Sequence, residues 1–127
     1  MELIEITGSI PVKQAAERTK RWRDAHPTFA KSFALSISDL QNLMNGLNAQ
    51  KELATELKAL RFYLGITQEG IPSLMMVGVT GDYDPDRQKG GVDILELEQG
   101  TDKYSLVFDF SCPCPYTCPE ANALTGE

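Results

Sequence analysis

The chain has 127 residues, is 42% hydrophobic, and has a formal net charge of -6 and a pI near 4.8. This length suffices for one hydrophobic core, so we expect a single domain over residues 1–127. The acidic balance argues against nucleic-acid partners, and no apolar run is long enough to cross a bilayer. The first residues also lack the pattern of a secretory signal, so a full-length product of this sequence is expected in the cytoplasm.

The N-terminal part predicts two helices. Ser9 and Pro11 are typical of a helix start, and an apolar stripe continues from there to Trp22, before His26-Pro27 ends the helix. The opposite face has an excess of cations: Lys13, Arg18, Lys20, Arg21 and Arg23. We interpret it as a solvated face, with anion or partner binding as the alternative.

A short strand is predicted at 33–37, and a second helix is predicted to begin at Ser38, which has capping-box spacing with Gln41. Its buried stripe would comprise Leu40, Leu43, Met44 and Leu47. Asn48 is expected to cap a further helical piece that continues towards Leu57.

The central part predicts two strands, at 60–66 and 73–79, joined by a turn that contains Gly70 and Pro72. The first alternates at period two and predicts one buried face, formed by Leu60, Phe62, Leu64 and Ile66. Arg61 and Tyr63 lie on the opposite face. The second is apolar on both faces and is typical of a central strand.

Beyond Val79 the pattern predicts a loop at 80–91 and two more strands, at 92–98 and 104–110. Helices and strands fall in separate runs, which favours an α+β fold. We therefore predict a single antiparallel sheet of four to five strands, with the N-terminal helices packed on one face.

Acidic residues alternate in the predicted loop, at Asp82, Asp84 and Asp86, with Asp93 further on. Hard cations such as calcium prefer carboxylate oxygens. However, an EF-hand loop needs glycine at its sixth position and flanking helices, and this stretch has Arg87 and flanking strands instead. We interpret it as a solvated acidic turn, with calcium binding as the alternative.

Three cysteines, Cys112, Cys114 and Cys118, lie in a Cys-Pro-rich tail that starts near residue 111. They could be idle thiols, a local disulfide, metal ligands or redox thiols. The spacing makes Cys114 to Cys118 the easier disulfide, because prolines hold Cys112 and Cys114 extended. A zinc site wants four ligands, and the local spacing offers three thiolates, with Asp109 nearby and the lone His26 far away in sequence, so this interpretation is incomplete.

The chain also resembles a family of short bacterial proteins of about 130 residues that is itself uncharacterised. The resemblance depends on a Trp-containing helix, an Arg-Phe-Tyr-Leu-Gly strand, Met76-Val-Gly-Val-Thr80, and the closing run from Asp109 to Cys118 with its Pro-Cys-Pro element. Positions that match are Arg61, Tyr63, Gly65, Gly78, Cys114 and Cys118. The resemblance implies no activity or residue role.

The leading hypothesis is a small, soluble, non-enzymatic module that binds a protein or small molecule, because no nucleophile elbow, phosphate loop or acid-base pair is present. Its candidate surface is the strand face with Arg61 and Tyr63, and the alternative is that both are simply solvent-facing. A second hypothesis is a metal-binding or thiol-redox function of the cysteine tail, with zinc as the alternative cofactor.

Overall fold

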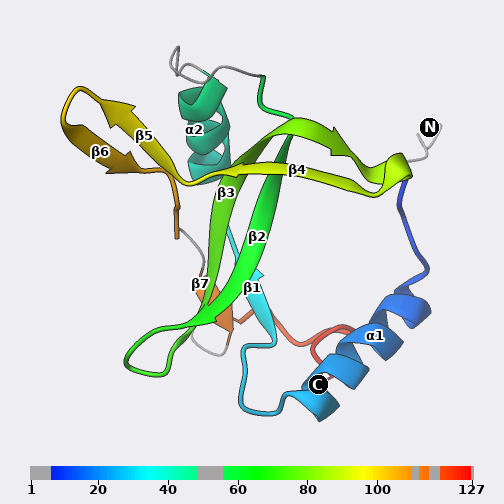
Figure 1. Cartoon of the computed structure of the whole chain (residues 1–127). Helices are drawn as coiled ribbons and strands as arrows, with labels where there is room; N and C mark the ends of the chain where they lie inside the picture. Colours follow the sequence, from blue (N-terminus) through cyan, green and yellow to red (C-terminus); the bar gives the residue numbers. More distant parts are fainter. Residues whose placement is uncertain (1–6, 49–55, 110–111, 115–117, 127) are drawn as a thin grey trace.

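The structure is a computed structural model that describes residues 7–48, 56–109, 112–114 and 118–126 (Figure 1). Within these ranges, two α-helices, a 3-10 helix and seven strands follow one another along the chain. They are α1 (Val12–Ala25), β1 (Ser32–Ala34), α2 (Ile37–Asn48), β2 (Ala59–Ile66), β3 (Pro72–Asp84), η1 (Pro85–Arg87), β4 (Lys89–Ile94), β5 (Glu96–Gln99), β6 (Asp102–Ser105) and β7 (Cys112–Cys114). The α+β class predicted from the sequence is confirmed.

The strands form three small antiparallel sheets, in the orders β2-β3-β4, β1-β7 and β5-β6. The prediction of a single sheet of four to five strands is therefore wrong. The predicted strand 92–98 breaks at Leu95, between β4 and β5, and the predicted strand 104–110 contributes β6 and only an isolated bridge from Phe108 to Met76. In addition, β1 pairs with β7, about 80 positions away in the sequence, rather than with the central sheet.

The hairpin of β2 and β3 has the predicted place and turn. Its register runs from Ala59 opposite Val79 to Ile66 opposite Pro72. The turn is closed by the Thr67 N–H, which donates to the Ile71 carbonyl at 2.9 Å, and Gly70 provides the left-handed conformation with φ of 84°. Glycine takes this conformation without a Cβ penalty, so the turn chemistry agrees with the sequence.

Residues 80–91 differ from the predicted loop. β3 continues to Asp84, η1 forms the tip, and β4 returns alongside, so the stretch is a second hairpin. The register shifts between Thr80 and Tyr83, where Gly81 has φ of 75°. A bulge of this kind lets a strand bend and continue through a glycine that would otherwise indicate a turn.

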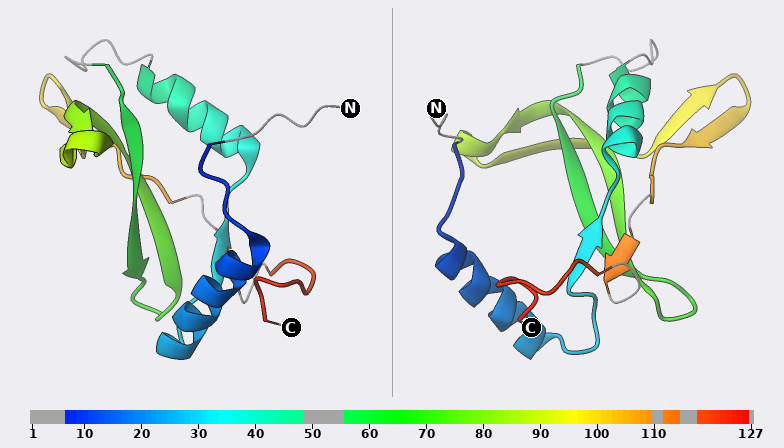
Figure 2. Two further views of the ribbon diagram at one scale, coloured as in Figure 1. Left: turned by 90° about the vertical axis from the view of Figure 1, so that its right-hand side faces the viewer. Right: turned by 180° about the vertical axis from the view of Figure 1, so that it is seen from behind.

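The core lies between α2 and one face of the central sheet. Leu43 and Leu47 of α2 pack with Met76 of β3 and with Leu106, and Met76 and Leu47 are at most 2% exposed. Gly78 permits this close approach, since a Cβ there would lie 2.8 Å from Leu57 Cδ1 and 3.1 Å from Leu47 Cδ1. Figure 2 shows both helices on the same side of the sheet.

The predicted inward face of β2 is not buried along its length. Leu60 packs against the core, but Phe62, Leu64 and Ile66 are 47%, 58% and 67% exposed. The reason lies in the packing of the helices: α2 covers the end of the sheet that contains Gly78, and α1 has no buried residue. Much of the apolar face of the hairpin is therefore left in contact with solvent.

The helix boundaries follow local hydrogen bonding. α1 has Pro11 at its N-cap position without a side-chain cap, in place of the predicted Ser9. α2 begins at Ile37, where Ser36 Oγ accepts from the Asp39 N–H at 3.0 Å, so Ser36 acts in place of the predicted Ser38. The predicted strand 33–37 accordingly stops at Ala34.

In the predicted stripe of α2, Leu43 and Leu47 are buried, whereas Met44 is exposed. Most of the further helical piece predicted after Asn48 lies outside the described residues. Neither helix in the described ranges is long and apolar enough to span a membrane.

Candidate functional site

β2 is an edge strand whose outer side pairs with no described strand. It is eight residues long and has a single charged residue, Arg61. Edge strands present unpaired backbone groups, and proteins usually protect them with charges, prolines or very short length. β2 has little of this protection, so it is a candidate surface for pairing with another strand.

The hydrogen bonds of β3 show in which direction the backbone N–H and C=O groups of β2 point. Met76 of β3 exchanges both of its backbone hydrogen bonds with Phe108, at 2.8 and 3.0 Å, on the side of β3 away from β2. Phe62 lies opposite Met76, so these two form a non-hydrogen-bonded pair, and the N–H and C=O of Phe62 point away from β3. By the alternation of an antiparallel ladder, the same holds for Leu60, Leu64 and Ile66.

The other edge of this sheet is β4, and its composition differs. β4 contains Lys89 and Asp93, and two adjacent glycines, Gly90 and Gly91. Charges and glycines weaken strand pairing at an edge. On β2, by contrast, the residues with outward backbone groups are the same ones that have exposed apolar side chains.

Arg61 and Tyr63 meet Asp93 on the opposite face of the sheet. Arg61 Nη1 forms an ion pair with Asp93 Oδ1 and Nη2 donates to the Gly90 carbonyl, while the Tyr63 hydroxyl donates to Asp93 Oδ2. Arg61 lies opposite Val77, and Asp93 lies opposite Val79, so the contacts span β3 from β2 to β4. Both valines are almost fully buried.

These contacts change the proton affinities of the cluster. The hydrogen bond to Asp93 is the main reason that the pKa of Tyr63 is raised, with partial desolvation adding to it. Desolvation works against the charge of Arg61, but its interactions with Tyr63 and Asp93 outweigh this and raise its pKa. The cluster therefore keeps the Tyr63 phenol protonated and the Arg61 guanidinium charged at neutral pH.

The sequence singled out Arg61 and Tyr63 but not their partner. Asp93 was grouped with the acidic turn, although it lies in a strand between Val92 and Ile94. A carboxylate inside an apolar strand is a signal for an ion pair on the same face, and it could have indicated Asp93. The existing contacts give Arg61 and Tyr63 a cross-sheet role, and their use as a binding surface stays a prediction.

The acidic residues of the predicted turn lie around the tip of the second hairpin. Asp82 forms an ion pair with Lys89 at 2.8 Å, and Asp84 Oδ1 accepts from the Asp86 N–H at 3.1 Å as the cap of η1. Asp93 lies at the other end of β4, in the cluster with Arg61 and Tyr63. The carboxylates of Asp82, Asp84 and Asp93 thus each have a local structural contact. Asp86 takes part through its backbone N–H, which donates to Asp84.

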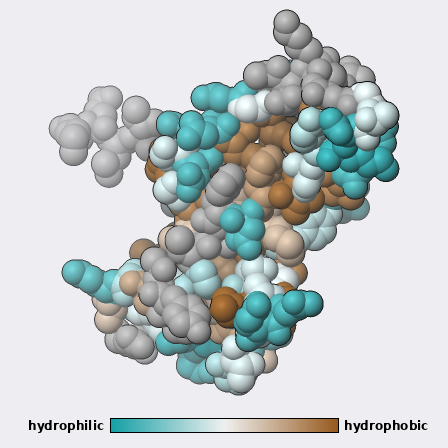
Figure 3. All heavy atoms as spheres, turned by 90° about the vertical axis from the view of Figure 1, so that its left-hand side faces the viewer, coloured by the Kyte–Doolittle hydropathy of each residue, from teal (hydrophilic) through white to brown (hydrophobic). Residues whose placement is uncertain are grey.

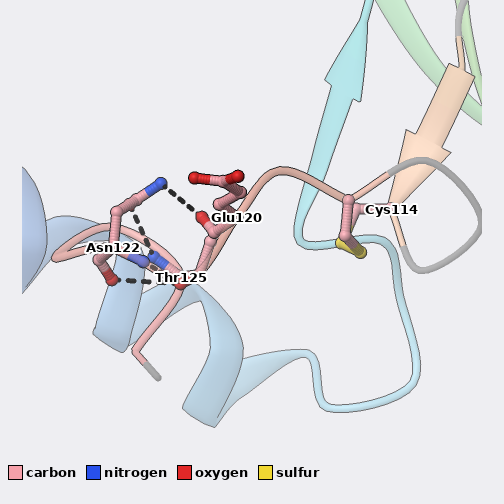
Figure 4. The surroundings of a disulfide bond; sticks show 5 residues. Cys114, Glu120, Asn122 and Thr125 are labelled. Atoms are coloured by element: carbon pink, nitrogen blue, oxygen red, sulfur yellow. Dashed lines mark hydrogen bonds between the residues drawn. A yellow bond between two sulfur atoms is a disulfide. The ribbon is translucent and has the colours of Figure 1, made fainter.

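The tail contains a disulfide between Cys114 and Cys118, with 4.6 Å between their Cα atoms (Figure 4). This is the pair that the spacing favoured. Cys114 is 1% exposed, because β7 pairs with β1 and its carbonyl accepts from the Lys31 N–H at 3.1 Å. Beyond Cys118, the side chain of Asn122 organises a turn with Glu120 and Thr125.

The disulfide bears on the metal hypothesis for Cys112, Cys114 and Cys118. Among the described residues, no group of three His, Cys, Asp or Glu side chains could hold a metal ion. Zinc binds thiolates, so zinc binding by Cys114 and Cys118 would first require reduction of their bond. The side chain of Cys112 lies outside the described part.

Hydrophobic residues also gather in a hollow of the molecular surface, in the upper half of the face seen in Figure 3. Exposed hydrophobic side chains beyond β2 include Met44, Leu95 and Tyr104.

Comparison of the chain with protein-family models, curated proteins and solved structures gave no match. The candidate site is therefore defined by its own geometry.

Proposed function

We propose that this chain is a protein-interaction module that pairs through the free edge of β2, with a second copy of the chain as its partner. The observation that supports this is the coincidence, at Phe62, Leu64 and Ile66, of outward backbone groups with exposed apolar side chains. Strand addition to an open edge uses both features: main-chain hydrogen bonds hold the added strand, and alternate side chains select it.

The sequence of β2 is complementary to itself in the antiparallel sense. Pairing centred on Tyr63 places Phe62 opposite Leu64 of the second copy, and Leu60 opposite Ile66. All of these residues have outward backbone groups, so the ladder closes without a shift. Arg61 falls opposite Gly65, which avoids placing like charges face to face. Such a pair would have the two-fold symmetry of most protein dimers.

Sedimentation velocity over a range of protein concentrations tests the proposal. We expect a dimer that Phe62→Lys dissociates, because a lysine on an edge strand opposes pairing. Ile66→Lys is the second variant, since Ile66 is 67% exposed and its replacement leaves the core intact. Val92→Lys is the matched control: Val92 is 60% exposed but lies on β4, and this variant should dimerise normally.

Amide hydrogen exchange supplies a second measurement on the same strand. The N–H groups of Phe62 and Leu64 should be protected only in the dimer, whereas those of Arg61 and Tyr63 point to β3 and should be protected at every concentration. A protein that stays monomeric at millimolar concentration, with fast exchange at Phe62 and Leu64, would contradict the proposal.

The tail favours a second candidate function, thiol-disulfide exchange. Cys118 is exposed while its partner Cys114 is buried, so one sulfur is open to an attacking thiolate. The reaction would reduce the bond to two thiols and oxidise two molecules of reduced glutathione to one disulfide. Equilibration with glutathione, followed by mass spectrometry, should then yield a mixed disulfide at Cys118 and not at Cys114. A bond that stays intact in excess glutathione would exclude this role.

A further inference from the structure

A cavity of about 330 Å³ lies between α1, the segment that leads into β1, and Leu64 of β2. Its walls include the rings of Trp22, Phe29 and Phe33, and its size and apolar lining fall within the range of small-molecule sites. It lies on the helix-bearing side of the sheet, away from Arg61, Tyr63 and Asp93. Of the residues that the structure describes, none in the cysteine tail or the acidic hairpin lines it.

The aromatic walls are held by specific contacts. The Trp22 indole N–H donates to the Ala30 carbonyl at 3.0 Å, and the Trp22 ring meets Phe29 edge-on at 5.7 Å between centroids. Phe29 in turn contacts Phe33 at 6.2 Å. These contacts fix the side chains before any ligand arrives, which lowers the entropy that binding would cost.

The cavity also has a cation that no carboxylate pairs with in the ranges that the structure describes. Arg18 lines it, and no carboxylate in the described part of the chain forms an ion pair with Arg18. Other cations of α1 are engaged: Lys20 pairs with Asp24 at 2.8 Å, and Arg23 donates to the Leu124 carbonyl at 2.7 Å. In a protein with net charge -6, an uncompensated guanidinium beside an apolar cavity favours an anionic group there.

We propose that this cavity binds a small apolar carboxylate, with the hydrocarbon body between Trp22, Phe33 and Leu64 and the carboxylate on Arg18. The planar guanidinium can donate two parallel hydrogen bonds to a carboxylate, which gives orientation as well as affinity. The body of the ligand could be an alkyl chain or an aromatic ring, because the lining is apolar for both.

Trp22 is the only tryptophan of the chain, so its fluorescence reports directly on this cavity. Titration with octanoate and with 3-phenylpropanoate should change the Trp22 emission. Tighter binding of octanoate would indicate that the cavity prefers an alkyl chain, and tighter binding of 3-phenylpropanoate that it prefers an aromatic ring. The neutral octanol and 3-phenylpropanol should bind at least about tenfold more weakly, as expected from loss of a charge-assisted hydrogen bond.

Matched variants locate the carboxylate. Arg18→Gln should weaken both acids about tenfold and leave both alcohols unchanged. Arg21→Gln, on the same helix but outside the cavity lining, should bind like the wild type. An emission that no acid changes at millimolar concentration, or an Arg18→Gln variant with wild-type affinity for the acids, would overturn the proposal. Both variants alter exposed residues, so loss of folding is not expected.

Discussion

At the scale of single residues, the cluster of Arg61, Tyr63 and Asp93 shows how three polar side chains can join the two outer strands of a sheet. Because Tyr63 donates to a carboxylate, its folded state favours the protonated phenol and its pKa is raised from the ordinary value of 10.0. The resulting stabilisation is present at pH values below 10 and is lost as the pH rises through the raised pKa.

We expect one of the four tyrosines to ionise later than an ordinary phenol in an ultraviolet absorbance titration, and Tyr63→Phe to remove that late step. Asp93→Asn should move the step back towards the ordinary value, because the acceptor loses its charge. Asp102→Asn, at an exposed aspartate of β6, should leave it in place. A Tyr63 that titrates at or below the ordinary value would show that the bond to Asp93 does not form in solution.

At the scale of elements, Gly91 determines whether β4 can return beside β3. Its φ is 72°, and a Cβ there would lie 2.6 Å from the Thr80 carbonyl oxygen and 2.8 Å from Val79 Cγ1. Gly100, in the turn between β5 and β6, has a similar φ of 64° but no atom within 4 Å of its Cβ position. Alanine variants at Gly100 and Gly91 therefore separate two costs: the left-handed backbone conformation alone at Gly100, and that conformation together with a steric clash at Gly91.

Gly100→Ala should therefore lower the free energy of unfolding by about 1 kcal/mol, the cost of a left-handed conformation for alanine. Gly91→Ala should lower it by at least roughly 3 kcal/mol, since the clash with the buried strand adds to the same strain. Urea unfolding of both variants measures the difference. Equal losses would mean that the Thr80–Tyr83 bulge adapts to a side chain at position 91.

The elements also show what the sequence could predict. The alternation in β2 and the turn residues Gly70 and Pro72 are local signals, and the hairpin that they predict is correct. The second hairpin was missed because Asp, Gly and Pro at 80–91 are typical of loops. In the structure, pairing with β4 keeps this stretch extended, and a bulge at Gly81 accommodates the glycine within the strand. The burial of β2 was mispredicted because a period of two identifies a face but not the layer that covers it.

The candidate site was predictable to a similar extent. Arg61 and Tyr63 share a face because of their spacing, whereas Asp93 reaches them only through the strand order β2-β3-β4. The cavity beside Trp22 depends on how far α1 stands from Leu64, a tertiary distance that no local pattern encodes. The preferred pairing of Cys114 with Cys118 was predictable because both cysteines lie within five residues, whereas the sequence left open whether they form a bond at all.

At the scale of the whole molecule, the tail connects parts of the chain that are distant in sequence. β7 pairs with β1, and beyond the disulfide the Leu124 carbonyl accepts from Arg23 of α1. The bond between Cys114 and Cys118 closes a loop of only five residues, so its effect on the entropy of the unfolded chain corresponds to roughly 2 kcal/mol of stability.

We expect reduction of the disulfide, or Cys118→Ser, to lower the free energy of unfolding by roughly 2 kcal/mol, as measured by urea unfolding. The Lys31 amide, which donates to the Cys114 carbonyl, should then exchange faster than in the oxidised protein. Cys112→Ser is the control, because it removes one thiol and keeps the Cys114–Cys118 bond. Unchanged stability after reduction would contradict the expected restriction of the unfolded chain by the five-residue ring. Unchanged Lys31 exchange would mean that pairing of β7 with β1 holds the tail without the disulfide.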